Sequence, residues 1–339
     1  MSSLCITGIG SEVPATVLTN DDLSKMVATS DEWITQRTGI KERRIADAGV
    51  SSSDLMVPAA QRALAMARKT AADLDLILVT YSFPDQLVPN TSDTFAQKLG
   101  APKTTLALDV TAECVGFCLA LGEAYDKMRL YPRYRTVLVV SGDATSKFVD
   151  YQDRETCILF GDGAGAVVIE GIDEEGYGIL GYRMDSDREF IDCVSARAGG
   201  TALPASGDTV RKREHYLHFG PNGGGPMLKA IVRKVPELRR GICADLGVPL
   251  EAIRLIIPHQ LNRRITDASK RQSATPVYDR NIARYGNCAG SSVALALDTA
   301  FREGEIVRGD YLMLEAYGAG MKYGNVVLRW WLPQQHGEQ

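Results

Sequence analysis

A cysteine in a glycine-rich apolar segment is the first residue whose type and position suit catalysis. Cys114 follows an apolar strand predicted over 105–110 and opens a helix predicted over 116–121. A thiol at a helix N-terminus feels the positive end of the helix dipole, so we expect a lowered pKa for Cys114. An adjacent carboxylate, Glu113, opposes this expectation if it faces the thiol. A buried structural cysteine is the alternative interpretation.

A histidine and an asparagine would complete a nucleophilic site. His259 ends an apolar strand predicted over 253–257, and ligands commonly bind at the carboxyl ends of strands in α/β layers. Asn287 precedes a second glycine-rich helix. A hydrogen-bonded strand-end histidine and an ordinary helix N-cap are the alternatives. If the three loop ends converge, Cys114, His259 and Asn287 form a site for nucleophilic catalysis.

The elements that must position these residues alternate between strands and helices. Continuous apolar runs of strand length, as expected for strands covered on both faces, occupy 74–81, 137–140, 166–169, 253–257, 311–314 and 326–330. Amphipathic helical segments separate them, and we expect Asn20 and Ser30 to be the N-caps of two early helices. This alternation predicts α/β layers.

An internal repeat indicates duplication. The segments ECVGFCLAL (113–121) and NCAGSSVAL (287–295) align without a gap at an offset of 174 residues, which places Asn287 opposite Glu113. The strand segments of the two halves follow in the same order at similar offsets. We therefore predict two similar halves related by a pseudo-twofold axis, residues 1–172 with the nucleophile and residues 173–339 with the histidine and asparagine.

Composition limits the classes of function. The chain has 339 residues and a formal net charge of −4, which argues against general nucleic-acid binding. No apolar run approaches the roughly 20 residues of a membrane span, and no secretory leader is expected, so the seven cysteines should be free thiols in the cytoplasm. No Cys or His pair has zinc-ligand spacing with a matching second pair, so we expect no metal.

Several segments together resemble the β-ketoacyl-[acyl carrier protein] synthase III family of the thiolase superfamily. They are ITGIGSEVP, SDEWITQRTGI, DRETCILFGDGAGAVV, HQLNRRI, RYGNCAGSS and LEAYGAG, which span nearly the whole chain. The resemblance implies a duplicated five-layered αβαβα fold, a homodimer, and a Cys–His–Asn triad. By motif position the triad is Cys114, His259 and Asn287.

The chemistry implied by this resemblance fits the residue types. Cys114 would take an acyl group from an acyl-CoA, with the backbone N–H groups of Cys114 and Ala319 holding the oxyanion. A malonyl thioester would then lose CO2 and condense, with N–H donors from His259 and Asn287 stabilising the charge on its thioester oxygen. Coenzyme A thioesters would be substrates, and no permanently bound cofactor is implied. The alternatives are acyl transfer to an alcohol, amine or carrier, and a non-catalytic subunit.

The resemblance also suggests binding surfaces for the two thioester carriers. For coenzyme A the matching positions are Trp33, Arg37 and Arg154 around the adenine, and Asn262 near the pantetheine arm. Surface or packing roles are the alternative for the first three. For an acidic acyl carrier protein, complementary charge would come from the basic cluster Arg264, Lys270 and Arg271. A solvated helix face is the alternative there.

The chain also departs from the family pattern. Glu113 stands where a small residue is usual, and it could act as a base, contact a polar substrate or pair elsewhere. Val88 matches a position that reaches into the partner's acyl pocket, where its modest size would admit more than an acetyl group. The segment 218–230, HFGPNGGGPMLKA, replaces a usually polar segment. Together these departures predict a specialised paralogue acting on an unusual starter or in secondary metabolism.

Overall fold

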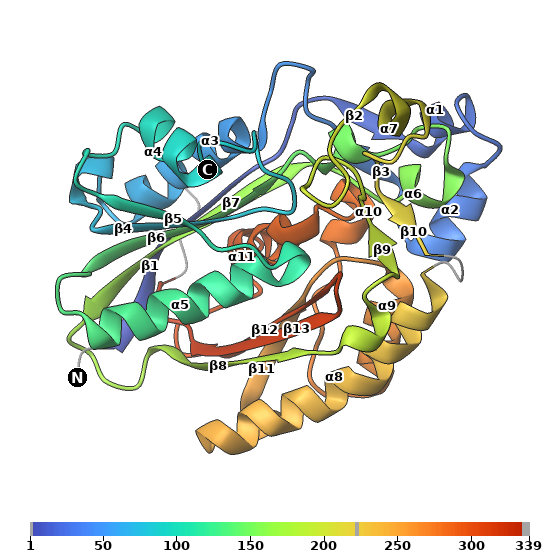
Figure 1. The fold of residues 1–339 in the computed structure, drawn as a ribbon. Coiled ribbons are helices and arrows are strands. Elements are labelled where there is room, and N and C mark those ends of the chain that lie inside the picture. The colour runs from blue at the N-terminus through green and yellow to red at the C-terminus, as the bar shows by residue number, and fades with distance from the viewer. Residues whose placement is uncertain (1–2, 221–223, 334–339) are drawn as a thin grey trace.

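The computed structural model describes residues 3–220 and 224–333 and contains two β-sheets that are separated and flanked by helices (Figure 1). Residues 221–223 of the unusual glycine-rich segment lie outside the described residues.

The first sheet is built from the most apolar segments of the N-terminal half. Its strand order is β1-β7-β6-β4-β5, with β4 parallel to β5 and β6, and β7 antiparallel to β1 and β6. Every residue of β4 and β6 is buried, which explains their continuous apolar sequence. The strands are β1 (Ser3–Glu12), β4 (Leu76–Thr80), β5 (Leu106–Asp109), β6 (Thr136–Asp143) and β7 (Gly163–Ile172).

The second sheet lies in the C-terminal half. Its strand order is β11-β12-β13-β8, with β11 parallel to β12, and β13 antiparallel to β12 and β8. The hairpin that joins β12 to β13 contains Ala319. The strands are β8 (Gly178–Ser186), β11 (Ile253–Pro258), β12 (Tyr311–Gly318) and β13 (Lys322–Arg329).

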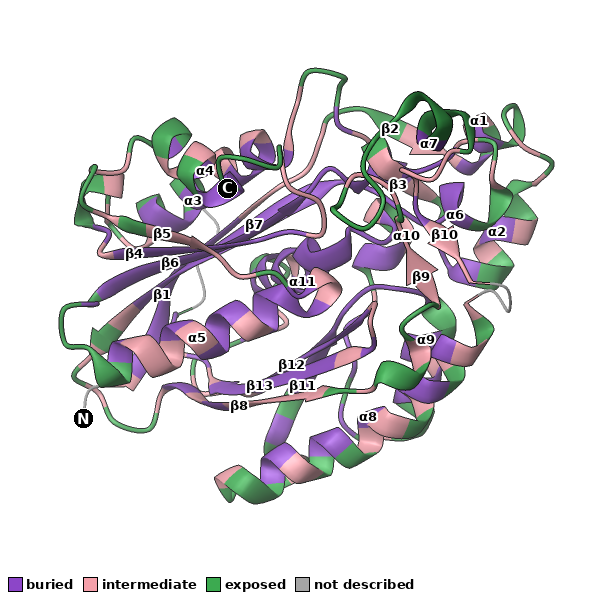
Figure 2. Ribbon diagram, in the orientation of Figure 1, coloured by how far each residue is buried: buried purple, intermediate pink, exposed green. Residues whose placement is uncertain are grey.

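Helices form three layers around the two sheets (Figure 1). The outer layers are α3 (Ser52–Met66) and α4 (Thr91–Leu99) on the first sheet, and α8 (Gly225–Leu246) and α9 (Arg263–Arg271) on the second. Between the sheets lie α5 (Gly116–Leu130) and α11 (Ser292–Arg302), whose side chains join both sheets in the largest apolar cluster. The strands of both sheets are accordingly mostly buried (Figure 2). The predicted αβαβα architecture is confirmed.

The two halves repeat the same order of elements. Reading from the antiparallel edge, β1-β7-β6-β4 in the first sheet corresponds to β8-β13-β12-β11 in the second. The position of β5 is taken in the second half only by an isolated parallel bridge between Ile256 and Val277. This repetition supports the proposed division of the chain near residue 172, since β8 begins the second series.

The register of the repeat differs from the sequence alignment by two residues. The turns before the two central helices share a left-handed residue, Glu113 with φ +48° and Ala289 with φ +44°. The structural offset is therefore 176 residues rather than the predicted 174. Cys114 corresponds to Gly290, and the predicted pairing of Asn287 with Glu113 is wrong.

Shorter elements form a cap at the end of the layers where the site lies (Figure 1). They are β2 (Val17–Thr19), β3 (Glu42–Arg44), α1 (Asn20–Ser24), α2 (Asp31–Thr38), α6 (Arg154–Cys157), β9 (Val194–Ser195), α7 (Gly207–Arg211), β10 (His218–Phe219) and α10 (Asn281–Tyr285). Ser30 caps α2 by accepting a hydrogen bond from Trp33 N–H, as predicted. The cap of α1 is Thr19 rather than Asn20, because the buried Asn20 amide instead donates to Asp31 and to the Ile40 carbonyl.

Candidate active site

The nucleophile candidate lies in a tight turn between β5 and α5. Cys114 is the middle residue of a 3₁₀ turn, Glu113–Val115, and α5 begins at Gly116. A Cβ atom at position 116 would lie 1.8 Å from Thr80 Oγ1, so only glycine lets α5 start this close to the end of β4. The sequence thus places the thiol where the first sheet meets a central helix.

A cavity of about 340 Å³ brings several of the predicted residues together. Cys114, Asn287, Ala319 and Glu113 all line it. Most of its remaining wall is apolar, and includes Phe83, Leu159, Phe160, Ile191, Val194, Leu217, Phe219, Met227 and Leu261. A mostly apolar wall with a few polar groups is the usual form of a site for a small-molecule ligand.

The hairpin between β12 and β13 lies directly against the thiol. A Cβ atom at position 318 would lie 3.1 Å from Cys114 Cβ and 3.2 Å from Cys114 N. Because Gly318 has no side chain, the following Ala319 can line the same cavity as Cys114. This arrangement is consistent with the predicted pair of oxyanion donors, the N–H groups of Cys114 and Ala319.

Asn287 is held with one orientation of its amide. The residue is buried, its carbonyl accepts a hydrogen bond from Gly161 N–H at 3.0 Å, and its own N–H donates to the Leu159 carbonyl at 2.9 Å. Its side-chain Oδ1 accepts from Ala289 N–H at 2.9 Å. Because the oxygen is engaged, the amide nitrogen is the group left to donate to a ligand in the cavity.

His259 is fully buried behind the hairpin and is not among the described residues that line the cavity. Its N–H donates to the Glu315 carbonyl, and its ring makes an edge-to-face contact with Tyr317, with 5.7 Å between the centroids. Neither ring nitrogen has a hydrogen-bond partner among the described residues. Burial lowers the pKa of His259 to about 3, so the imidazole is neutral at physiological pH.

The expectation of an acidic thiol is not supported. Burial, together with the carboxylates of Asp143 and Glu113, raises the pKa of Cys114 above its usual value. Cys114 is therefore a neutral thiol at rest, and an attack on a substrate requires that its proton be accepted. The neutral imidazole of His259 is a group of the right type to accept it.

The unusual Glu113 pairs with a lysine on the hairpin between β12 and β13. Its Oε2 accepts from Lys322 Nζ at 2.8 Å, and both side chains are about two-fifths exposed. Of the three roles considered for Glu113, pairing elsewhere is the one observed. The ion pair connects the turn of Cys114 to the first residue of β13.

We predict that Glu113→Gln reduces turnover by less than about threefold and changes the free energy of unfolding by less than about 1 kcal/mol, because half-exposed ion pairs contribute little. Steady-state kinetics measures turnover, and chemical denaturation measures the free energy of unfolding. Lys322→Gln should change both quantities as little as Glu113→Gln does. A loss of activity by more than about tenfold in Glu113→Gln alone would mean that the carboxylate contacts substrate.

The residues predicted to bind adenine lie together on the cap. The guanidinium groups of Arg37 and Arg154 lie 4.5 and 4.8 Å from the centroid of the Trp33 ring, reaching it from α2 and α6. Asn262 has a structural role, since its side chain caps α9 by accepting from Arg264 N–H at 2.9 Å. It is not among the described residues that line the cavity.

The predicted docking residues lie on α9. Arg264, Lys270 and Arg271 are all exposed, but Lys270 also pairs with Asp279 at 2.5 Å. α9 packs beside α2, which carries Trp33, so the basic helix and the adenine candidates share one side of the molecule.

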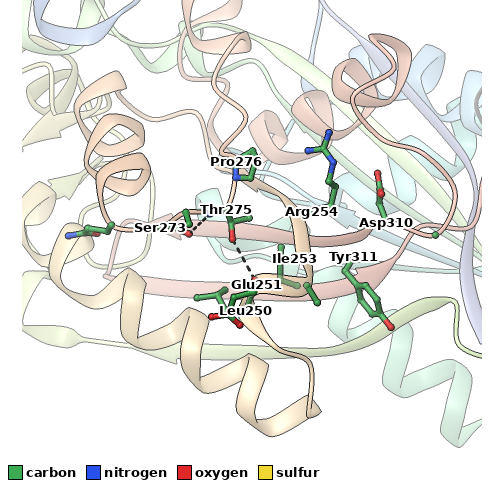
Figure 3. A pocket seen from close by; sticks show the side chains of 13 residues that line it. Leu250, Glu251, Ile253, Arg254, Ser273, Thr275, Pro276, Asp310 and Tyr311 are labelled. Carbon is green, nitrogen blue, oxygen red and sulfur yellow. Dashed lines mark hydrogen bonds between the residues drawn. The ribbon is translucent and has the colours of Figure 1, made fainter.

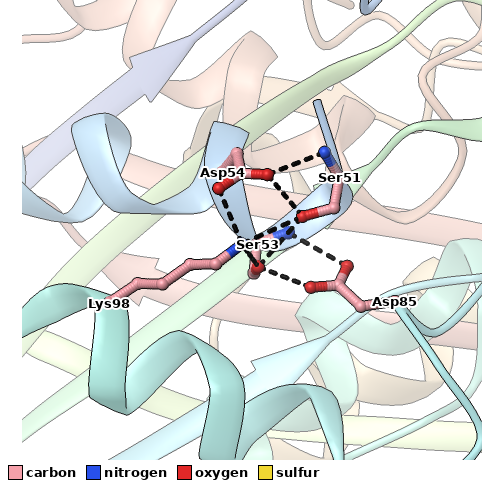
Figure 4. A network of polar contacts seen from close by, with 5 residues as sticks. All are labelled: Ser51, Ser53, Asp54, Asp85 and Lys98. Carbon is pink, nitrogen blue, oxygen red and sulfur yellow. Dashed lines mark hydrogen bonds and ion pairs between the residues drawn. The ribbon is translucent and has the colours of Figure 1, made fainter. Parts of the chain in front are cut away.

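Val88 lies at the tip of the loop between β4 and α4. It is 84% exposed and its neighbour Leu87 is 76% exposed, so both project away from their own chain. The base of the loop is fixed, because Asp85 accepts hydrogen bonds from the backbone and hydroxyl of Ser53 in a network that includes Ser51, Asp54 and Lys98 (Figure 4). Val88 is therefore free to contact a partner subunit, and that contact stays a prediction.

A larger hollow lies away from these residues. It measures about 590 Å³ at the amino ends of β11 and β12 and is lined by Leu250, Arg254, Thr275, Asp310 and Tyr311 among others (Figure 3). None of the predicted site residues lines it. Within residues 3–220 and 224–333, no group of three metal-ligating side chains is found, and no helix is long and apolar enough to cross a membrane.

Sequence reasoning missed two charged residues at the site, Asp143 and Lys322. Asp143 ends the apolar strand β6 and affects Cys114 electrostatically. A polar residue at the carboxyl end of a buried strand was the signal that singled out His259, and it applies equally to Asp143. No comparable signal marks Lys322, whose contact with Glu113 spans 209 residues.

The duplicated αβαβα body, with a cysteine at the start of a central helix, defines a thiolase-like protein. Two family models match the chain: 3-oxoacyl-[acyl-carrier-protein (ACP)] synthase III at residues 108–188, and the C-terminal part of the same family at residues 243–330. The chain is 41% identical over 328 residues to the β-ketoacyl-[acyl-carrier-protein] synthase III of Caldanaerobacter subterraneus subsp. tengcongensis, covering 96% of this chain and 97% of the relative. The chain therefore belongs to the 3-oxoacyl-[acyl-carrier-protein] synthase III family, as its motifs predicted.

Solved structures agree with this assignment. The crystal structure of 3-oxoacyl-[acyl-carrier-protein] synthase III from Aquifex aeolicus VF5 superimposes with a TM-score of 0.87 at 36% identity, covering 97% of this chain and 100% of that one. The priming β-ketosynthase from the R1128 polyketide biosynthetic pathway superimposes with a TM-score of 0.88 at 29% identity, covering 98% and 97%.

Proposed function

We propose that the protein is a decarboxylative condensing enzyme that transfers an acyl group from coenzyme A to Cys114 and joins it to a malonyl thioester. The product is a β-ketoacyl thioester, and the extender arrives on an acyl carrier protein. The observation that carries the proposal is the shared apolar cavity, which is lined by a cysteine and by an asparagine whose amide oxygen is already engaged. Family membership supports the same reaction.

In the loading step, the Cys114 sulfur forms a bond to the acyl carbon and the bond to the coenzyme A sulfur breaks. Because the pKa of the thiol is raised, its proton must leave as the bond forms. The imidazole of His259, whose ring nitrogens have no hydrogen-bond partner among the described residues, would accept this proton and return it to the coenzyme A thiolate. The N–H groups of Cys114 and Ala319 would hold the negative charge that develops on the acyl oxygen.

In the condensation step, the malonyl group loses CO2 and the electron pair moves towards its thioester oxygen. The neutral imidazole of His259 and the amide nitrogen of Asn287 are proposed to donate hydrogen bonds to that oxygen. The resulting carbon nucleophile attacks the acyl group and the bond to the Cys114 sulfur breaks, which leaves a thiolate that takes up a proton from solvent to restore the resting thiol. The product leaves with the thioester that carried the malonyl group.

Asn287 disfavours the alternative of acyl transfer to an alcohol or amine. That reaction develops no charge on a malonyl oxygen and does not need a neutral donor at this position. The acyl group would be accommodated by the apolar wall that includes Phe83, Phe160 and Leu217.

The site is proposed to bind coenzyme A through Trp33, Arg37 and Arg154. An adenine ring is planar and would stack against the indole and the guanidinium groups, which already converge. The proposed assembly is a cytoplasmic homodimer in which Val88 reaches the partner's acyl pocket. Carrier-protein docking would use Arg264 and Arg271, with Lys270 partly committed to Asp279.

We predict that Trp33→Ala raises KM for an acyl-CoA by about tenfold, since stacking of one base on an aromatic ring contributes about 1–3 kcal/mol. Turnover of an acyl thioester that lacks the nucleotide should not change. Trp331→Ala is a matched control, because Trp331 also lies under a guanidinium group, that of Arg308, but follows the far end of β13. Equal losses with both thioesters would show that Trp33 only supports the fold.

The proposed reaction is tested by supplying acyl-CoA with malonyl-carrier protein and measuring CO2 and β-ketoacyl-carrier protein together. Equimolar appearance of both is expected. Acyl transfer to an added alcohol or amine without CO2 would favour the alternative and overturn the proposal. The length of the acyl-CoA can be varied in the same assay to test the prediction of an unusual starter.

A further inference from the structure

A buried carboxylate joins three parts of the site without being part of the proposed chemistry. Asp143 is the last residue of β6 and is 1% exposed. Its Oδ1 accepts from Ser82 N–H at 2.6 Å, and its Oδ2 accepts from Ser291 N–H at 3.2 Å. Ser82 begins the loop that continues into the cavity wall at Phe83, and Ser291 immediately precedes α11. One side chain therefore connects the first half of the chain to the second.

The same carboxylate lies beside Gly290, which also approaches the turn that carries the nucleophile. A Cβ atom at position 290 would lie 3.2 Å from Asp143 Oδ2 and 2.9 Å from the Glu113 carbonyl oxygen. Gly290 thus permits the start of α11, the turn of Cys114 and the carboxylate to meet at one junction. Asn287 lies three residues before Gly290, and its Oδ1 is bonded within this same turn, to Ala289 N–H. A change in the packing of Gly290 against Glu113 and Asp143 would therefore move Asn287 relative to the thiol.

The junction contains no described cation that hydrogen-bonds to Asp143. Its hydrogen-bond donors among the described residues are two backbone N–H groups, and the hydroxyl group of Ser141, which lies near the same junction, is buried without a partner among those residues. A carboxylate in such surroundings is costly to ionise, and burial raises the pKa of Asp143 to about 7. Because burial makes ionisation of this carboxylate unfavourable, we expect Asp143 to have a role beyond packing.

The other titratable groups near this junction lie on several elements. Glu113, which is paired with Lys322, raises the pKa of Cys114. Tyr317 interacts electrostatically with Cys114. Asp162 lies immediately before β7, and its negative charge raises the pKa of Asp143. Both aspartates raise the pKa of the buried Cys288. Among these groups, the two whose charge raises the pKa of the Cys114 thiol are Asp143 and, with a smaller effect, Glu113.

We propose that Asp143 is a positioning residue for the condensation, which fixes the turn of Asn287 and the cavity loop of Ser82 against the turn of Cys114. The inference rests on the proposed function, because the two turns need a defined separation only if thiol and amide act on the same pair of substrates. A second consequence is electrostatic. A negative charge beside the thiol disfavours the thiolate, so removing that charge should make Cys114 react at lower pH.

The test compares Asp143→Asn with the wild-type protein in two measurements. The first is the pH midpoint of Cys114 alkylation by iodoacetamide, followed by mass spectrometry of the peptide that contains Cys114. It should fall by about half a pH unit or more, equivalent to about threefold faster alkylation at a fixed pH above about 7, where Asp143 is ionised, and below the midpoint. The second is the ratio of CO2 release to acyl loading, which should fall by about tenfold, because the amide nitrogen that replaces one carboxylate oxygen cannot accept the N–H group now bonded to that oxygen. An unchanged midpoint or an unchanged ratio overturns the proposal.

Asp162→Asn is the matched control. Asp162 is also fully buried and accepts from backbone N–H groups, but these belong to Ala46 and Ser146 rather than to the site loops. Its replacement should leave the alkylation midpoint of Cys114 unchanged. An equal shift in both variants would mean that a general loss of buried charge is responsible, which would also overturn the proposal.

If Asp143→Asn does not fold, as judged by circular dichroism, Gly290→Ala tests the same junction from the side of α11. Its methyl group would meet the Glu113 carbonyl and the Asp143 carboxylate, so the ratio of CO2 release to loading should again fall, while loading stays within about threefold. An unchanged ratio overturns the proposal. Failure of the proposed function is distinguishable, because wild-type protein that releases no CO2 refutes condensation, whereas the alkylation midpoint needs no condensing activity.

Discussion

Cys114→Ala is expected to abolish acyl loading and to lower condensation by more than about three orders of magnitude, because Cys114 is the only cysteine among the described residues that line the cavity. Intact-protein mass spectrometry after incubation with acyl-CoA measures loading directly. Slow decarboxylation of the malonyl thioester should persist in this variant. The donors assigned to that step, His259 and Asn287, are unchanged, and the cavity keeps its shape.

Cys118→Ala provides the control for this prediction. Cys118 lies one turn further along α5, is fully buried in the central apolar cluster and does not line the cavity. Its replacement should lower stability with little effect on loading, since it removes a small buried side chain. If Cys118→Ala lost loading and Cys114→Ala retained it, the assignment of the nucleophile would be wrong.

Asn287→Asp is expected to lower CO2 release by more than about 100-fold while loading changes by less than about threefold. One carboxylate oxygen would still accept from Ala289 N–H, and the other would present a negative charge where the amide now offers a donor. Loss of one such donor in an oxyanion site typically costs about 3 kcal/mol of barrier. Single-turnover measurements with preloaded enzyme separate the two steps.

Asn281→Asp is a suitable comparison for this variant. Asn281 is also buried, but its amide contacts Tyr278 and Thr299 near α11 and does not line the cavity. Asn281→Asp should retain both acyl loading and CO2 release. Equal loss of loading and CO2 release in Asn287→Asp would contradict the proposed division of roles, because it would place the amide in both steps.

Much of the fold could be predicted because the strands are buried on both faces. Segments such as 74–81 and 137–140 are mostly apolar, and they contribute β4 and β6 to the middle of the first sheet. The repeat was also visible, but its register was not. Small residues align equally well two positions apart, whereas the left-handed φ of Glu113 and Ala289 is set by the backbone of the turn.

The site was predicted best where a residue type is tied to a local element. Cys114 and Asn287 precede predicted helices, whereas Ala319 was implied by the family resemblance, and the structure brings all three to one cavity. The ion pair of Glu113 with Lys322 depends on contact between distant parts of the chain, so local patterns could not reveal it.

The expected lowering of the Cys114 pKa by the helix dipole is not supported, for a related reason. The helix N-terminus is visible in the sequence, but the burial of Cys114 and its proximity to Asp143 arise from tertiary structure. Dimerisation, carrier-protein docking and specialisation for an unusual starter stay predictions, since each depends on a molecule outside the single chain.

The central claim, a covalent acyl intermediate that is consumed by decarboxylative condensation, is tested most directly in a two-step experiment on one sample. The protein is incubated with isotopically labelled acyl-CoA, freed of excess substrate and analysed by mass spectrometry, and malonyl-carrier protein is then added. We predict one acyl group on Cys114 after the first step, followed by its transfer to the carrier protein with one equivalent of CO2. An adduct on another residue, or an adduct on Cys114 that persists while CO2 is absent, would contradict the account.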